Sequence, residues 1–244
     1  MLTKIKKGLQ VFKLFVYIFR AKNYKEYLSF AQAGEDRILR FLFSSMGLKQ
    51  ITYLEIGTNN PIDINNTFLF YLGGSRGVCI EPNPMLISKI KNKRPQDICL
   101  NVGVTASQKE SIMDFYIFDE GDTEKGLSTF SKEDAEHVEK TTAIKIAEVK
   151  KIPVTNVNDI LIKYFSEKVP TLISLDVEGL DLSILKGIDF NRFRPVAICV
   201  ETVNFTVHHK KVKNEEIINF MKSQGYFVYA DTGINSIFAD KSLF

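Results

Sequence analysis

The sequence predicts an α/β fold in which a doubly wound, mostly parallel sheet of about seven strands carries helices on both faces. Strand-like and helix-like segments alternate along most of the chain. Most of the strand-like segments are apolar throughout, as is typical of strands that are buried on both faces of a parallel sheet. The chain has 244 residues, of which 45% are hydrophobic, so it can bury the core that such a sheet requires. Ligands of these sheets bind at the carboxyl ends of the strands.

The first half of the sheet is predicted from three apolar runs and the helices around them. A helix is expected before the first strand, because apolar residues recur at helical spacing from Ile38 to Phe43 and Gly47 follows. The predicted strands are 51–56, 77–81 and 97–104, and they are connected by helices at 65–74 and 84–94.

The second half contains the least regular part of the chain, from Ser111 to Pro153. Strands are expected at 114–118 and 143–154, and the polar stretch 121–140 between them is predicted to be a loop or flap. A helix at 156–165 follows, with Thr155 or Asn156 as its cap. The remaining predicted elements are strands at 171–176, 195–201, 226–231 and 236–240, and helices at 180–188 and 214–225.

The N-terminal 29 residues are predicted to form an amphipathic helical extension of a domain that spans residues 30–244. Lys6, Lys13 and Arg20 recur at intervals of seven and line one side of an otherwise apolar helix. Such a helix packs on its own sheet, lies on an anionic membrane or a partner through residues 4–20, or is a processed signal. It is too short in apolar length to span a bilayer, and no cleavage site for a signal peptide is clear. We therefore expect a cytoplasmic protein, with peripheral contact at the inner membrane face as an option. The net charge of +3 is too small to indicate nucleic-acid binding.

A glycine, two asparagines and an acid surround the first strand-to-helix turn. In YLEIGTNNP, Gly57 directly follows a strand, where the backbone must turn tightly and pass close to a ligand. Glu81 ends the next strand, where an acid in Rossmann-like sheets accepts hydrogen bonds from the hydroxyls of a ribose. The turn lacks the GxGxxG pattern of a pyrophosphate site, whereas Asn59, Asn60 and Glu55 suit an amino acid's ammonium and carboxylate. A ribose and an amino acid without phosphate indicate S-adenosylmethionine. An ordinary surface turn is the alternative.

Two further acids follow a later strand. In LISLDVEGLDL, Asp176 ends the strand, and Glu178 follows before Gly179 permits a turn into a helix. At the ligand edge of the sheet these carboxylates can orient an acceptor, remove its proton or hold a divalent cation. The alternative is that they cap the helix that follows. His208 and His209 are another possible general base, although a solvated loop is the simpler interpretation.

The stretches YLEIGTNNP, RGVCIEPNP, PVTNVNDIL and ISLDVEGLDLSILKGIDFNRFRPVAICVE resemble the FkbM-type S-adenosylmethionine-dependent methyltransferases. AQAGEDRIL resembles the element before the first strand in that family, so the resemblance runs from about Phe30 to Glu201. It implies a Rossmann-like class I methyltransferase fold with a seven-stranded sheet, and methyl transfer to a hydroxyl oxygen. The cofactor-binding residues predicted with its help are Gln32, Glu35, Asp36, Glu55, Gly57, Asn59, Asn60, Glu81, Asn83, Asn101 and Asp176.

The leading hypothesis is an O-methyltransferase that acts on a hydroxyl of a sugar, polysaccharide or related glycan. Asp176 and Glu178 are its predicted catalytic residues, with a divalent cation between them as an option. The flap around Leu127–Phe130 is expected to close over the acceptor. An NAD(P)-dependent oxidoreductase on a similar sheet is disfavoured, because the phosphate-binding glycine pattern is missing. A non-catalytic scaffold that binds the cofactor is the third hypothesis.

Overall fold

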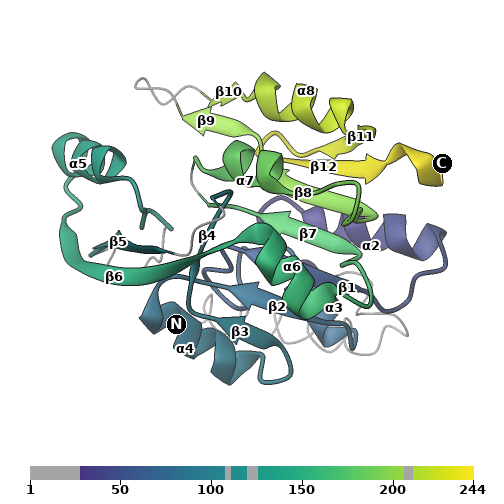
Figure 1. The fold of residues 1–244 in the computed structure, drawn as a ribbon, viewed down its shortest axis with the longest axis horizontal. Coiled ribbons are helices and arrows are strands. Elements are labelled where there is room, and N and C mark those ends of the chain that lie inside the picture. The colour runs from purple at the N-terminus through teal and green to yellow at the C-terminus, as the bar shows by residue number, and fades with distance from the viewer. Residues whose placement is uncertain (1–27, 108–110, 120–125, 178, 206–210) are drawn as a thin grey trace, which may run out of the picture.

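The computed structural model describes residues 28–107, 111–119, 126–177, 179–205 and 211–244. Seven strands form its central sheet in the order β11-β12-β8-β7-β1-β2-β3 (Figure 1). Neighbouring strands are parallel except at β12, which is antiparallel to both β11 and β8. The predicted seven-stranded, mostly parallel sheet is therefore confirmed. Its strands are β1 (Thr52–Ile56), β2 (Arg76–Ile80), β3 (Ile98–Leu100), β7 (Leu172–Leu175), β8 (Ala197–Glu201), β11 (Tyr226–Asp231) and β12 (Asn235–Asp240).

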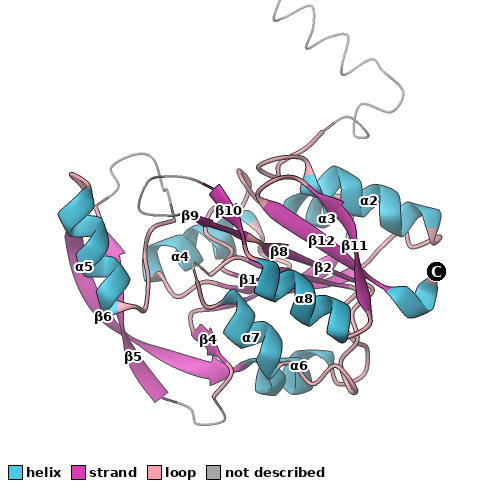
Figure 2. Ribbon diagram, turned by 90° about the horizontal axis from the view of Figure 1, so that it is seen from above, coloured by secondary structure: helices cyan, strands magenta, loops and turns pink. Residues whose placement is uncertain are grey.

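Helices cover both faces of this sheet (Figure 2). On one face lie α2 (Glu35–Ser45), α3 (Phe68–Leu72) and α4 (Pro84–Lys93), and on the other α6 (Val157–Phe165), α7 (Asp181–Gly187) and α8 (Glu215–Ser223). Side chains of a strand alternate between faces, so Leu54 and Ile56 enter one core and Tyr53 the other. Asn156 caps α6 by accepting a hydrogen bond from the Asn158 amide, as one of the two predicted caps.

Parallel register brings the ends of the middle strands to one edge. Ile56, the last residue of β1, is paired with Ile80 of β2 on one side and with Leu175 of β7 on the other. The next residue of each strand is therefore at the same level. Gly57, Glu81 and Asp176 are these three residues, so the fold assembles at its carboxyl edge the groups that the sequence places apart.

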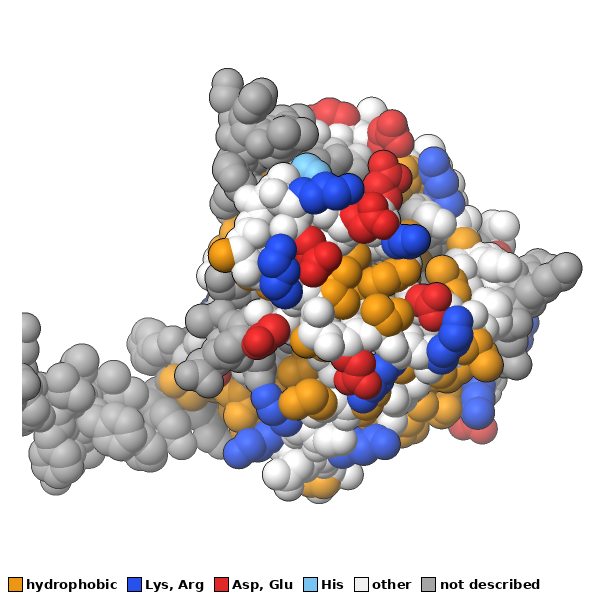
Figure 3. All heavy atoms as spheres, turned by 90° about the vertical axis from the view of Figure 1, so that its left-hand side faces the viewer, with side chains coloured by type: hydrophobic (Ala, Val, Ile, Leu, Met, Phe, Trp, Pro, Cys, Tyr) orange, Lys and Arg blue, Asp and Glu red, His pale blue; other side chains and the backbone are white. Residues whose placement is uncertain are grey.

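Residues 103–156 build a separate arm on the side toward which β2 and β7 run (Figure 1). Its sheet has the order β4-β6-β5, and a helix, α5, accompanies it. The bounds are β4 (Gly103–Thr105), β5 (Ser111–Phe118), α5 (Lys132–Thr141) and β6 (Ile146–Asn156). Phe115, Ile117 and Ile152 form a small core of its own with Phe130. Figure 3 shows this side of the molecule, where apolar side chains are interspersed with charges of both signs.

Three elements differ from the prediction. The single strand predicted at 97–104 is two strands, because the chain leaves the central sheet after Leu100 and pairs with β6 from Gly103 on. The stretch 121–140, predicted to be loop or flap throughout, contains α5, whose cap is Ser131. A two-stranded sheet of β9 (Val203–Phe205) and β10 (Lys211–Lys213) was not predicted.

Several predictions fall on residues outside the described ranges. They are the helix within residues 1–29, its membrane contact through residues 4–20, the placement of Glu178, and that of His208 and His209. The boundary at residue 30 and the cytoplasmic location also stay predictions. Within the described ranges, no helix is both long and apolar enough to cross a membrane.

Candidate active site

Gly57 lies where β1 ends against the backbone of β7. Its φ of 82° is in the left-handed region that favours glycine. A Cβ atom at this position would lie 1.8 Å from the backbone oxygen of Asp176. The amides of Gly57 and Thr58 both donate to the Ile80 carbonyl at 3.0 Å, which ties the turn to β2. The predicted close approach therefore exists, but the neighbour that forbids a side chain is the Asp176 backbone rather than a ligand.

The next two residues carry buried oxygen atoms without a partner among the described residues. They are Thr58 Oγ1 and Asn59 Oδ1. Buried polar atoms are nearly always hydrogen-bonded. Two buried oxygens without partners on consecutive residues therefore indicate a place where a ligand supplies the hydrogen bonds. An ammonium group donates to both kinds of oxygen. Both oxygens can therefore accept from an ammonium group such as that of S-adenosylmethionine, and the contact predicted for Asn59 stays a prediction.

Glu81 follows β2 and is buried, with 5% of its surface exposed. Its Oε2 accepts from the Asn59 amide at 2.9 Å, and its Oε1 from the Asn83 amide at 2.8 Å. Burial raises the pKa of Glu81 to about 7, although these two amides oppose the shift. Each oxygen keeps a further lone pair, so the carboxylate can still accept from ribose hydroxyls. Asn101 braces this corner, because its Nδ2 donates to the carbonyls of Glu81 and Pro82 at 2.9 and 2.8 Å.

Asp176 directly follows β7, and its amide donates to the Ile56 carbonyl at 3.1 Å. Its side chain is exposed to solvent. Protein packed around the carboxyl group nevertheless raises its pKa to about 7, with the charges of Asp181 and Glu55 as further causes. Water that reaches the side chain opposes this shift. The result is an accessible carboxyl group at the ligand edge whose pKa is raised above its usual value.

Asp181, which the sequence analysis missed, holds the turn beyond Asp176. Its two carboxylate oxygens accept from the amides of Val177 and Gly179 at 3.3 and 3.2 Å. Leu180, at the cap position of α7, makes no side-chain cap hydrogen bond. The carboxylate at this helix start is therefore that of Asp181, and capping does not occupy Asp176. Glu178 lies outside the described residues, so its catalytic role stays a prediction.

Glu55 is engaged in a buried cluster that we call the Arg94 network. Arg94 has no exposed surface, and its guanidinium carries five N–H groups. They donate to Asp97 (2.8 Å), Glu55 (3.1 Å), Asn65 (3.2 Å), the Tyr53 hydroxyl (2.9 Å) and the Thr67 hydroxyl (2.8 Å). Burial raises the pKa of Glu55, while the Arg94 charge opposes this. The predicted role of Glu55 at a cofactor ammonium stays a prediction, and its Oε2 is already bound by Arg94.

Two acidic residues at the start of α2 hold the loop before it, and the cofactor contacts predicted for them stay predictions. Glu35 and Asp36 were expected at the cofactor, but neither side chain has exposed surface. Glu35 accepts from the amide of Ala33, the hydroxyl of Thr232 and the side chain of Asn235. Asp36 accepts from the hydroxyl of Ser29 and the amide of Phe30 at 2.7 Å each. Both carboxylates thus shape the loop around Gln32, whose own side chain is exposed and whose cofactor contact stays a prediction.

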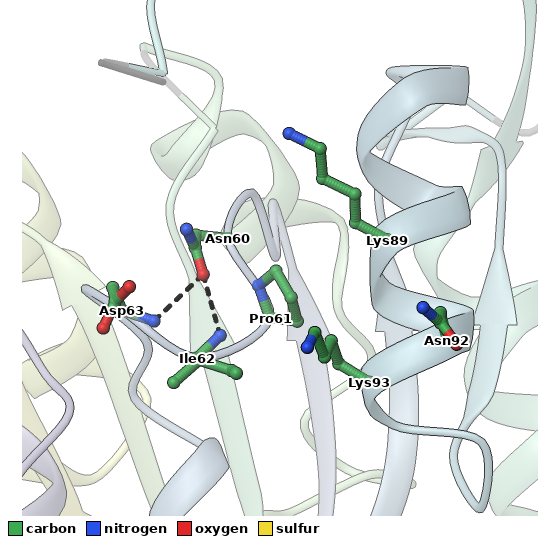
Figure 4. A pocket seen from close by; sticks show the side chains of 7 residues that line it. All are labelled: Asn60, Pro61, Ile62, Asp63, Lys89, Asn92 and Lys93. Atoms are coloured by element: carbon green, nitrogen blue, oxygen red, sulfur yellow. Dashed lines mark hydrogen bonds between the residues drawn. The ribbon is translucent and has the colours of Figure 1, made fainter. Parts of the chain in front are cut away.

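Two asparagines expected to contact the cofactor act on the backbone through their side-chain oxygens. Asn60 Oδ1 accepts from the amides of Ile62 and Asp63 at 2.9 and 3.0 Å, beside a surface hollow that α4 lines with Lys89, Asn92 and Lys93 (Figure 4). Asn83 Oδ1 accepts from the Met85 amide and so caps α4. Both side-chain oxygens thus have backbone partners, and the cofactor contacts predicted for Asn60 and Asn83 stay predictions. The backbone amide of Asn83 reaches the site indirectly, because it holds Glu81.

Part of the predicted flap contacts the Gly57 turn. A Cβ atom on Gly126 would lie 3.1 Å from Asn59 Nδ2. The amide and carbonyl of Thr129 exchange hydrogen bonds with those of Tyr116 in β5, at 3.1 and 2.8 Å. The segment from Gly126 to Phe130 thus runs from Asn59 to the arm. Closure of this segment over an acceptor stays a prediction.

The part of the chain that the structure describes contains no preformed set of ligands for the predicted divalent cation. No group of three His, Cys, Asp or Glu side chains there is placed to hold a metal ion. Because Glu178 is not described, the cation predicted for Asp176 and Glu178 stays a prediction.

Residues 55–228 match the sequence model of a family described as the methyltransferase FkbM domain. The chain belongs to the FkbM methyltransferase family. It is thus an S-adenosylmethionine-dependent methyltransferase, which decides between the predicted hypotheses against an oxidoreductase. A Tyr-x-x-x-Lys spacing, which some oxidoreductases use, does occur at Tyr164 and Lys168, but it lies at the end of α6, before β7 begins.

Comparisons with individual proteins add little to this FkbM methyltransferase. No curated protein matches its sequence. Among solved structures, the chain is similar to a TehB-like SAM-dependent methyltransferase from Corynebacterium glutamicum ATCC 13032 Kitasato. The two share 11% sequence identity over 97% of this chain and 99% of the other, with a TM-score of 0.42.

Proposed function

We propose that this FkbM methyltransferase methylates a hydroxyl oxygen of a glycan or another sugar-containing acceptor. The observation that carries the proposal is the carboxyl group of Asp176, which is accessible at the carboxyl edge beside the Gly57 turn and has a pKa of about 7. A group that titrates near neutral pH is well matched to removing a proton from an acceptor. The sugar-containing acceptor rests on the family resemblance alone.

The residues at the carboxyl edge divide the work between cofactor and acceptor. S-adenosylmethionine supplies an electrophilic methyl group on a positively charged sulfur. Thr58 Oγ1 and Asn59 Oδ1 hold the amino-acid end, because these are the oxygens that lack partners. Glu81 accepts from the ribose hydroxyls. Asp176 orients the acceptor hydroxyl and takes its proton as the oxygen is methylated, which requires the hydroxyl at near-attack distance.

Methylation of purified surface glycans tests the proposal. The protein is incubated with S-adenosylmethionine and glycans from cells that lack the gene, and glycan mass is measured against the release of S-adenosylhomocysteine. We expect a gain of one methyl group per S-adenosylhomocysteine released. Methylation on nitrogen or carbon would overturn the O-methyl assignment. Binding of S-adenosylhomocysteine without turnover on any hydroxyl acceptor would return the protein to the scaffold hypothesis. A chelator in the same assay separates Asp176 acting directly from a cation held by Asp176 and Glu178.

A further inference from the structure

Asn65 joins the Arg94 network to the turn that carries Thr58 and Asn59. Its side chain is 2% exposed. On one side, Oδ1 accepts from Arg94 Nη1 at 3.2 Å and from the amides of Thr67 and Phe68 at 3.1 and 2.8 Å. On the other side, Nδ2 donates to the carbonyl of Asn60 at 3.0 Å and to that of Thr58 at 3.4 Å, and it also lies 3.3 Å from Glu55 Oε2. One amide group therefore bridges the buried arginine and the backbone of the turn.

The turn needs such support because its backbone is in an unfavourable conformation. Asn59 has a φ of 51°, and the β-branched Ile64 has a φ of 54°. A non-glycine residue with positive φ costs free energy, and it persists only where the surroundings hold it in place. The two carbonyls that Asn65 Nδ2 contacts are those of Thr58 and Asn60, which flank Asn59 in the chain. Asn65 therefore restrains the residue whose Oδ1 lacks a partner.

The Arg94 side chain in turn determines where Asn65 lies. A fully buried arginine is costly unless every donor is paired, and here all five N–H groups are. Its partners come from β1 (Tyr53 and Glu55), from the segment before α3 (Asn65 and Thr67) and from the residue before β3 (Asp97). The guanidinium thus connects the strand below the turn with the segment that follows it. A displacement of Asn65 would break a bond to a buried charge.

We infer that Asn65, held by Arg94, is a positioning residue for the cofactor. It fixes the turn from Thr58 to Asn60 so that Thr58 Oγ1 and Asn59 Oδ1 point to the amino-acid end of S-adenosylmethionine. Neither Asn65 nor Arg94 contacts the cofactor. The inference rests on the proposed function in one respect, namely that S-adenosylmethionine binds at this turn.

The test compares three full-length variants by calorimetric titration with S-adenosylhomocysteine. Asn65→Asp keeps an acceptor for Arg94, Thr67 and Phe68 but replaces the Nδ2 donor, and Asn65→Ala removes both. Tyr53→Phe is the matched control, because it removes the hydroxyl that Arg94 and Asp97 share without touching the turn. Thermal unfolding and amide hydrogen exchange, both without added ligand, accompany each titration.

We expect all three variants to unfold at lower temperature, while only the two Asn65 variants lose affinity. The loss should be about tenfold, the equivalent of one missing hydrogen bond to the ligand, and Tyr53→Phe should stay within about twofold of the wild type. The Asn59 amide, which donates to Glu81, should exchange faster in the Asn65 variants only. A purely stabilising role would leave the affinity of folded protein unchanged.

Two outcomes would overturn the inference. One is wild-type affinity and wild-type exchange in folded Asn65→Asp and Asn65→Ala. The other is an equal loss of affinity in Tyr53→Phe, which would show that any damage to the network acts in the same way. Failure of the O-methyl assignment gives a different result, because binding of S-adenosylhomocysteine and its response to Asn65 would both remain. If the wild-type protein did not bind S-adenosylhomocysteine at all, the premise that the cofactor binds at this turn would fail, although the exchange of the Asn59 amide would still respond to Asn65.

Discussion

The Arg94 network and the carboxyl edge share strand β1 and its turn, but they differ in how their polar groups are satisfied. In the network, every guanidinium N–H has a partner and no part of Arg94 is exposed. At the edge, Thr58 Oγ1 and Asn59 Oδ1 have no described partner, and Asp176 is exposed. Buried groups that are fully paired hold one conformation, whereas unpaired ones at an accessible edge are available to a ligand. The difference separates the residues that support the site from those that act in it.

Replacing Arg94 should produce the largest effect, and it should fall on stability. Arg94→Leu leaves Glu55 and Asp97 buried without their countercharge, so we expect a loss of about 3–5 kcal/mol in the free energy of unfolding. Urea denaturation measures it. Lys151→Leu is the control, because Lys151 pairs with Asp114 on the surface and exposed pairs contribute about 1 kcal/mol or less. Similar losses in the two variants would contradict the role given to the network.

Replacing Asp176 should affect turnover instead of stability. Asp176→Asn keeps the shape but cannot take a proton, so turnover should fall by about 100-fold or more. Affinity for S-adenosylhomocysteine should stay close to that of the wild type. Since the pKa of Asp176 is about 7, wild-type turnover should rise as pH increases through that value, and the variant should lose this rise. Near-normal turnover in both Asp176→Asn and Glu178→Gln would remove general base catalysis from the proposal.

Replacing Glu81 should weaken cofactor binding. The carboxylate offers acceptors for the ribose and also holds the amides of Asn59 and Asn83. Glu81→Ala should therefore raise the dissociation constant of S-adenosylhomocysteine by about 10- to 100-fold, since one charge-assisted hydrogen bond contributes about 1.5–3 kcal/mol. Calorimetry measures the change. An unchanged constant would mean that the ribose binds elsewhere.

The smallest expected effect is the pH dependence of stability that Glu81 causes. Its pKa is about 7 in the folded protein and 4.5 as the reference value, so between these values the folded state binds more protons. Stability therefore decreases as pH rises, by about 1 kcal/mol between about pH 6 and 8 for this group. Urea denaturation at both pH values should show a smaller decrease in Glu81→Gln. The same decrease in both proteins would assign the effect to other groups.

Much of the carboxyl edge was predictable, because it depends on strand ends. The sequence shows that Gly57, Glu81 and Asp176 each follow an apolar run, and parallel strands must end at one edge. The cofactor contacts predicted for Glu35 and Asp36 stay predictions, and the structure adds that both carboxylates are buried and paired. A sequence does not distinguish an acidic residue that binds a ligand from one that stabilises a loop. Only the burial and the hydrogen-bond partners of the side chain distinguish the two roles.

The sequence by itself determined the strands and helices of the central sheet in chain order, the ends of β1, β2 and β7 to within one residue, and the family resemblance. These follow from hydrophobic period and from residues near each other in the chain. Only the tertiary structure revealed the Arg94 network, because its members come from β1, from the residue that follows α4 and from the segments around residues 65 and 97. Arg94 lies in the basic stretch KIKNKR, which by composition indicates a solvated helix end. Its burial depends on partners up to 41 residues away in the chain, such as Tyr53. The pattern of residues around Arg94 gives no information about partners that distant.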